Sequence, residues 1–212
     1  MNSHRTPMAT PQRRRRRALA TGAALCLASV LAVPTPATAK SSGDAVLVVG
    51  DSLTVGAADF GGLRSKLEEA GYAPTISART GRGVQWGLSV LQSSGSALPS
   101  TVVIALGTND VASGRSTKSF GALVDEVMKT VGSDRFVLWV NLDLDATTWG
   151  AAQAARFNRV LGEKANKYGN LAIADWQTFA ADAWLAPDFV HLNGKGYRQR
   201  ANFYLWQLQA WT

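Results

Sequence analysis

Cysteine and histidine are scarce in this chain, and both shortages limit how the fold and its site can be built. The 212 residues include one cysteine, Cys26, and two histidines, His4 and His191. A single cysteine cannot close a disulfide within the chain, which excludes the disulfide framework on which many small exported proteins depend. The fold must therefore be held by its hydrophobic core.

The first 39 residues have the pattern of a secretory signal peptide. A basic block, Arg13 to Arg17, precedes an apolar, uncharged run from Ala18 to Val33, and Ala37-Thr38-Ala39 offers small residues for cleavage. We expect cleavage after Ala39 and a short polar tether over residues 40–44. The apolar run is shorter than the roughly 20 residues of a membrane helix, and an uncleaved membrane anchor is the alternative. The arginine block would also suit the twin-arginine export route.

The charge of the chain is concentrated at its N-terminus. The whole sequence has 22 basic and 15 acidic residues, with a net charge of +7. Six of the basic residues and none of the acidic ones precede Lys40, so the expected mature chain is nearly neutral, with 16 basic against 15 acidic residues. This balance removes the main compositional argument for nucleic-acid binding.

Short apolar segments alternate with amphipathic ones along the rest of the chain. The segments that predict strands are Ala45–Gly50, Pro74–Ala78, Thr101–Leu106, Phe136–Leu142 and Leu171–Ala174. The segments that predict helices are Thr54–Ala70, Val84–Gln92, Lys118–Val131, Trp149–Tyr168 and Gly194–Trp211. Strands that alternate with helices predict one α/β domain over residues 45–212, in which helices cover both faces of a parallel sheet.

A serine lies where the first predicted strand meets the following helix, in Gly50-Asp51-Ser52-Leu53. In open α/β sheets, ligands bind at the carboxyl ends of the strands. Backbone N–H groups at the start of a helix also favour negative charge there. Ser52 is therefore a candidate nucleophile, whereas Asp51 is expected to bond the local backbone at the turn.

Two further loops offer hydrogen-bond donors for an oxyanion. Gly81, after the second predicted strand, permits close backbone approach and could present its N–H, although a simple turn explains this loop as well. Asn109, in Gly107-Thr108-Asn109-Asp110 after the third strand, could donate its side-chain amide to a developing alkoxide. The alternative for this loop is that its Asn and Asp side chains satisfy the local backbone.

His191 is the only histidine left after the expected cleavage, so a serine activated by histidine has to use it. Asp188 precedes it by three residues, and one tight turn can bring the carboxylate to Nδ1 of the imidazole. Such a bond fixes the tautomer of the ring and stabilises the imidazolium. Taken alone, the pair is equally a surface histidine near the start of a helix.

Together the four segments resemble those of the SGNH, or GDSL-type, esterases and acylhydrolases, over nearly the whole mature chain. Gly50-Asp51-Ser52-Leu53 is similar to the first block of the family, and Gly81 to the glycine of the second block. Gly107-Thr108-Asn109-Asp110 is similar to the third block, and Asp188-Phe189-Val190-His191 to the DxxH of the fifth. The resemblance implies a three-layer αβα sandwich around a flavodoxin-like, five-stranded parallel sheet.

The resemblance also implies two-step acyl transfer without a metal or cofactor. Ser52 would be the nucleophile, His191 the base and Asp188 its orienting acid. The Ser52 and Gly81 N–H groups and the Asn109 amide would form the oxyanion hole. Asp110 and Asp175 are expected to be structural.

A finer resemblance is to the extracellular SGNH domains of cell-wall O-acetyl enzymes, including peptidoglycan O-acetyltransferases. The segments that carry it are Val140-Asn141-Leu142, Trp149, the helix with Asn158 and the segment Asn170 to Trp176. Such transferases usually carry a multi-span membrane domain. Because this chain has none, a free-standing, secreted hydrolase is expected, with no stable membrane span after cleavage.

The chain has little length beyond its predicted core, which indicates an open site without a large lid. Such a site suits short acyl groups, acetyl above all, on a large alcohol such as a cell-wall polysaccharide. Trp86, Trp149 and Trp184 could form a sugar-binding surface, or they pack against the sheet and helices. The alternatives for the whole protein are an O-acyltransferase or lipase using the same site, and a non-catalytic carbohydrate-binding or adhesion module.

Overall fold

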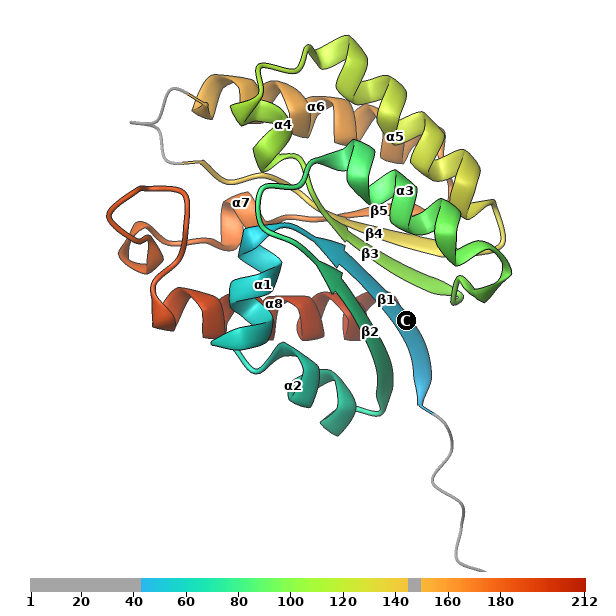
Figure 1. Ribbon diagram of the computed structural model, residues 1–212, viewed down its shortest axis with the longest axis horizontal. Helices are drawn as coiled ribbons and strands as arrows, with labels where there is room; N and C mark the ends of the chain where they lie inside the picture. The colour runs from blue at the N-terminus through green and yellow to red at the C-terminus, as the bar shows by residue number, and fades with distance from the viewer. Residues whose placement is uncertain (1–42, 145–149) are drawn as a thin grey trace, which may run out of the picture. The chain divides into compact units, whose positions relative to one another are not determined.

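Five parallel strands form the centre of the computed structural model, which describes residues 43–144 and 150–212 (Figure 1). Their bounds are β1 Asp44–Gly50, β2 Tyr72–Ala78, β3 Thr101–Ala105, β4 Phe136–Val140 and β5 Leu171–Ala174. Their order in the sheet is β2-β1-β3-β4-β5, and every neighbouring pair is parallel. This is the flavodoxin-like order, so the predicted fold class is confirmed.

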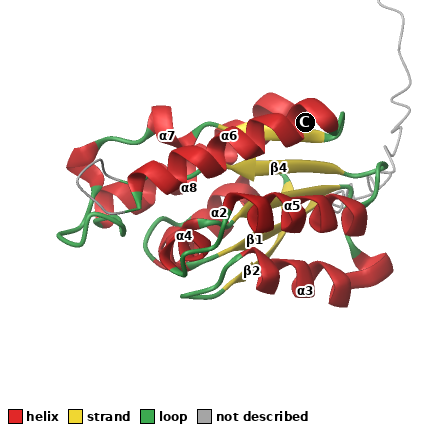
Figure 2. Ribbon diagram, turned by 90° about the horizontal axis from the view of Figure 1, so that it is seen from above, coloured by secondary structure: helices red, strands yellow, loops and turns green. Residues whose placement is uncertain are grey.

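Helices cover both faces of the sheet (Figures 1 and 2). Their bounds are α1 Ser52–Asp59, α2 Leu63–Glu69, α3 Val84–Ser94, α4 Thr108–Ala112, α5 Thr117–Val131, α6 Ala151–Lys167, α7 Trp176–Phe179 and α8 Gly194–Trp211. Short 3₁₀ turns occupy η1 Gly95–Ala97 and η2 Asp182–Trp184. The structure therefore has the three layers of an αβα sandwich.

The inner strands β1, β3 and β4 are apolar over most of their length because both of their faces are buried. On one face, Val49, Ile104 and Trp139 pack with α3, α5 and α6. On the other face, Val48 and Val103 pack with α1, α2 and α8. The two cores are dense in aromatic side chains and hold the sheet as a rigid support for the loops at its edge.

The predicted helix over Thr54–Ala70 is wrong, because the structure has two helices there. The break falls at Gly61 and Gly62. A Cβ added at Gly61 would lie 2.4 Å from the Tyr197 carbonyl oxygen of α8, and Gly62 takes a left-handed φ of 69°. Close approach of α8 and a turn that favours glycine thus end α1 early.

Several short elements differ from the sequence prediction. The prediction of an Asn/Asp loop over 107–110 is wrong, because residues 108–110 form the first turn of helix α4 and only Gly107 precedes it; the sequence does not predict α7. Helices of four or five residues are too short to show a hydrophobic period. β2 begins two residues earlier than predicted, and its Pro74 is accommodated because β2 is an edge strand.

The expected signal peptide and Trp149 lie outside the described residues. Within the part that is described, none of the helices has the length and hydropathy that a membrane crossing requires. The loops that follow β1, β2 and β3 all leave the same edge of the sheet, because the strands are parallel. The loop before α8 reaches this edge as well, and the site is built there (Figure 1).

Candidate active site

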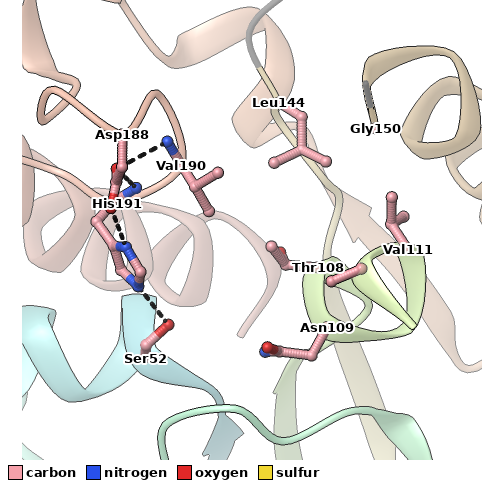
Figure 3. A pocket seen from close by; sticks show the side chains of 10 residues that line it. Ser52, Thr108, Asn109, Val111, Leu144, Gly150, Asp188, Val190 and His191 are labelled. Carbon is pink, nitrogen blue, oxygen red and sulfur yellow. Dashed lines mark hydrogen bonds and ion pairs between the residues drawn. The ribbon is translucent and has the colours of Figure 1, made fainter. Parts of the chain in front are cut away.

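Ser52, His191 and Asp188 lie in a line at the carboxyl edge of the sheet (Figure 3). Ser52 is the first residue of α1, directly after β1. The distance from its Oγ to Nε2 of His191 is 2.9 Å, and that from Nδ1 of His191 to Oδ2 of Asp188 is 2.7 Å. The structure thus brings together a hydroxyl, an imidazole and a carboxylate, in the arrangement in which a histidine can take a serine proton.

A tight turn holds Asp188 and His191 in register. Oδ1 of Asp188 accepts hydrogen bonds from the backbone N–H of Val190 at 3.1 Å and of His191 at 2.8 Å. Between them, Phe189 takes a left-handed φ of 58°, which is uncommon outside glycine. The Asp188 carboxylate therefore fixes the loop with one oxygen and the imidazole with the other.

The pKa of Asp188 is lowered to about 2. Partial desolvation raises it, but the hydrogen bonds from the His191 ring and from the N–H groups of His191 and Val190 outweigh that effect. The carboxylate is consequently ionised at neutral pH. It can orient the imidazole and stabilise its protonated form.

Asn109 lies in the first turn of α4, with its side chain directed toward Ser52 (Figure 3). Its Nδ2 donates to the carbonyl oxygen of Arg82 at 3.1 Å and lies 3.4 Å from Oδ2 of Asp51. These two acceptors set the orientation of the amide. Gly81 is not part of the cavity that contains Ser52; it lines a neighbouring hollow, and Asn109 borders both.

The cavity beside Ser52 has a volume of about 240 Å³. Ser52, Asn109 and His191 form its polar end. The rest of its wall is largely apolar and includes Val111, Leu144 and Val190 (Figure 3). An apolar cavity that ends at a hydroxyl and an imidazole suits an acyl group whose carbonyl carbon meets the hydroxyl.

Asp51 has a larger role than the local turn that the sequence predicts. Its Oδ1 caps α1 by accepting from the Leu53 N–H at 3.0 Å, and its Oδ2 is the one near the Asn109 amide. Burial raises the pKa of Asp51 to about 6, against the lowering effect of the Leu53 hydrogen bond and of the positive charge of Arg200. A buried carboxylate thus lies directly behind the donor that faces Ser52.

Asp110 joins two of the loops at this edge. The side chain is buried, and its Oδ2 accepts from the Val84 N–H, the first of α3, at 2.8 Å. Its Oδ1 accepts from Nε of Arg115 at 2.6 Å. A Cβ added at Gly83 would lie 2.6 Å from the same carboxylate. Asp110 therefore fixes the start of α3 against α4, next to Asn109.

The sequence model of the GDSL-like lipase/acylhydrolase family matches residues 48–199. The chain belongs to this family. That span runs from β1 into α8 and includes Ser52, Asn109 and His191. No curated protein sequence matches the chain.

Solved structures place the chain among SGNH hydrolases in fold. The catalytic domain of peptidoglycan O-acetyltransferase A from Streptococcus pneumoniae, with a methylsulfonyl adduct, is 23% identical, with a TM-score of 0.66 over 79% of this chain and 94% of that one. The esterase EstA from Pseudoalteromonas is 16% identical, with a TM-score of 0.67 over 79% and 98%. A family 3 carbohydrate esterase from Clostridium thermocellum is 18% identical, with a TM-score of 0.59 over 76% and 92%.

Two of the three tryptophans proposed as a sugar-binding surface of this GDSL-like protein are described. Trp184 packs against Trp176 and Phe179, with ring centroids 6.3 and 5.6 Å apart, so it belongs to the aromatic core around α7. Trp86 is partly exposed and lines the hollow beside Asn109. In the ranges 43–144 and 150–212, no group of three His, Cys, Asp or Glu side chains is arranged to hold a metal ion.

Proposed function

We propose that this protein is an exported serine esterase that removes short acyl groups, acetyl above all, from the hydroxyls of a cell-wall polysaccharide. The observation that carries the proposal is the pair of hydrogen bonds by which the His191 ring is joined to the Asp188 carboxylate, which accepts, and to the Ser52 hydroxyl. Membership of the GDSL-like lipase/acylhydrolase family and the apolar cavity beside Ser52 support it.

In the proposed reaction, Nε2 of His191 accepts the Ser52 proton while Oγ attacks the ester carbonyl carbon. The N–H group of Ser52 and the amide of Asn109 donate to the oxyanion. The Gly81 N–H, which lies in the neighbouring hollow, stays a prediction from the sequence as a third donor. His191 then gives its proton to the leaving alcohol as the acyl-enzyme forms. A water molecule that His191 deprotonates releases the acid and restores Ser52, so the steps need no metal or cofactor.

The size of the cavity favours short acyl chains. An apolar cavity of about 150 Å³ already holds a benzene molecule. The cavity beside Ser52, of about 240 Å³, therefore accommodates an acyl group of a few carbons. A fatty acyl chain would have to extend out of it, along the protein surface.

Replacement of the serine tests the proposal. We expect Ser52→Ala to lower kcat/KM for p-nitrophenyl acetate by about 10⁴-fold or more, with an unchanged melting temperature, because Oγ of Ser52 is the hydroxyl oxygen that contacts His191. Ser133→Ala, an exposed serine away from the site, is the matched control. A fluorophosphonate should label the wild type at Ser52 and leave the Ser52→Ala variant unlabelled.

Other outcomes would point to the alternative functions. Equal activity of Ser52→Ala and the wild type would contradict the esterase proposal, and absence of activity and labelling in the wild type would favour a binding module. A strong preference for p-nitrophenyl palmitate over the acetate would indicate a lipase. Acylated sugar in the presence of an acceptor would indicate an O-acyltransferase that uses the same acyl-enzyme.

Export is a separate part of the proposal. The basic block and apolar run before Ala39 support it. Mass spectrometry of the protein recovered from the culture medium or cell wall should find a mature chain that begins at Lys40. An intact N-terminus on membrane-bound protein would instead indicate an uncleaved anchor.

A further inference from the structure

A second hollow adjoins the cavity of Ser52, and Asn109 lines both. It has a volume of about 460 Å³ and lies between the start of α3 and the helix α4. The side chains that give it its character are Arg82, Gln85, Trp86, Ser89 and Arg115. A substrate with its carbonyl at Asn109 can therefore reach into the hollow without leaving the protein surface.

The two spaces differ in chemistry. The cavity of Ser52 has Val111, Leu144 and Val190 in its wall. The hollow combines amide, hydroxyl and guanidinium groups with one indole and with the buried Asp110 carboxylate, whose charge is paired with Arg115. Trp86 packs partly against the hydrophobic core between the sheet and α3, which holds the indole in place. A fixed aromatic ring surrounded by hydrogen-bond donors suits a sugar ring, whose C–H face packs on the indole while its hydroxyls bind the polar groups.

Arg82 adds an uncompensated positive charge to this surface. In the described part of the chain, no carboxylate lies within ion-pair distance of Arg82, and its Nε is buried without a hydrogen-bond partner. Arg115, by contrast, is already paired with Asp110 and hydrogen-bonded to Ser119. A buried donor without an acceptor is unfavourable, and a guanidinium matches the geometry of a carboxylate.

We propose that this hollow binds a carboxylate-bearing sugar unit of the acylated polymer, with Arg82 facing the carboxylate and Trp86 the sugar ring. The proposal rests on the esterase function proposed above and names its substrate class: an acidic, rather than neutral, O-acylated glycan. The ester carbonyl lies at Ser52 and Asn109, and the acidic sugar lies on the α3 side of Asn109.

The test compares an acidic with a neutral substrate. We expect kcat/KM to be higher for O-acetylated oligogalacturonate than for O-acetylated xylo-oligosaccharide of the same length. Arg82→Gln should lower kcat/KM for the acidic substrate by about tenfold or more relative to p-nitrophenyl acetate, mainly through KM, because a hydrogen bond between charged groups is lost. Arg82→Lys keeps the charge but not the planar guanidinium. Its kcat/KM for the acidic substrate should lie between those of the wild type and of Arg82→Gln.

Arg79→Gln is the matched control, because it removes the same charge from the same loop. Arg79 is exposed and does not line the hollow. This variant should change the ratio of kcat/KM for the acidic substrate to kcat/KM for the neutral substrate by less than about twofold. An equal effect of Arg79→Gln and Arg82→Gln would overturn the proposal in favour of a general charge effect. The proposal also fails if the wild type does not prefer the acidic substrate.

Binding separates this proposal from the esterase function. Unacetylated trigalacturonate should bind the Ser52→Ala variant and lose affinity by about tenfold or more when Arg82→Gln is added, as measured by calorimetry. If binding behaves in this way but no substrate is hydrolysed, the esterase function fails and the acidic-sugar site stands. If esters are hydrolysed but trigalacturonate does not bind, the acidic-sugar site fails alone.

Discussion

At the scale of single residues, the site depends on side chains that hold other side chains. The buried side chain of Asp51 caps α1 by accepting from the Leu53 N–H, and it also contacts the Asn109 amide. The carboxylate is an acceptor in each contact. An asparagine at position 51 could keep the cap, since Asn and Asp are equally good N-caps, but it would turn an NH₂ group toward Asn109.

Asp51→Asn should therefore reduce catalysis while leaving the helix intact. We expect kcat for p-nitrophenyl acetate to fall by about 10- to 100-fold with little change in KM, because loss of one oxyanion donor costs about 10²–10³ and here the donor is misdirected rather than removed. Asp182→Asn, in the exposed turn η2, is the control. A kcat of Asp51→Asn within twofold of the wild type would show that Asp51 does not orient Asn109.

The sequence predicts which polar side chains meet at the site better than it predicts the residues that hold those side chains in place. The interaction of Ser52 with His191 could be predicted because the expected mature chain has one histidine. The contacts of Asp51 with Asn109 and of Asp110 with Val84 join residues far apart along the chain. Nothing in the local pattern indicates these contacts, since they depend on how closely α3 and α4 approach.

At the scale of elements, helix α3 begins without a side-chain cap of its own. Gly83 is its N-cap residue, and Asp110 of α4 supplies the acceptor for the Val84 N–H. The carbonyl of Arg82, one residue earlier, accepts from Asn109. The start of α3 and the Asn109 amide are thus held by each other.

Gly83→Ala tests this coupling. The added Cβ would meet the Asp110 carboxylate at 2.6 Å, so we expect the hydrogen bond to Val84 to be lost and the unfolding free energy to fall by about 1–3 kcal/mol. kcat/KM should fall by about tenfold or more as Asn109 shifts. Gly162→Ala in α6, where a Cβ meets nothing within 4 Å, should instead keep activity and stabilise the protein by about 0.5–1 kcal/mol. Equal behaviour of the two variants would contradict the coupling.

The elements themselves are predicted well where a hydrophobic period is long. All five strands and the helices α3, α5, α6 and α8 lie within a few residues of their predicted positions. The prediction of one helix over Thr54–Ala70 is wrong because the contact between Gly61 and the Tyr197 carbonyl joins α1 to a helix more than a hundred residues later. Tertiary contacts of this kind override the local pattern.

At the scale of the whole molecule, the buried carboxylate and the paired carboxylates change the free energy of unfolding with pH in opposite directions. The pKa values of Asp188 and Asp125 are lowered to about 2. For Asp125, burial raises the pKa, but hydrogen bonds from Lys164, Tyr168 and Lys167 outweigh it. The stability that these two groups contribute is present above their ordinary pKa of 3.8 and is lost as pH falls from about 4 to about 2.

Asp51 acts in the opposite direction. Because burial raises its pKa from 3.8 to about 6, the folded state binds this proton more tightly than the unfolded state does. The Asp51 contribution should therefore lower the free energy of unfolding by up to about 3 kcal/mol as pH rises from 4 to 6. Urea denaturation at pH 3, 5 and 7 should show the highest stability near pH 5. Asp51→Asn should flatten the profile between pH 4 and 6 only, and an unchanged slope there would contradict the raised pKa.

The separation of Ser52 from His191 also bears on when activity can arise during biosynthesis. Ser52 follows the first strand, and its partner in the hydrogen bond comes 139 residues later, just before the last helix. The Thr54 hydroxyl lies 2.7 Å from the Tyr204 hydroxyl, so the two ends of the described fold meet beside the serine. A nascent chain, or one cut short before His191, carries the hydroxyl without its imidazole. Any activity that needs the Ser52–His191 pair therefore requires synthesis of nearly the whole chain, up to the loop before α8, and partial chains that end earlier lack it.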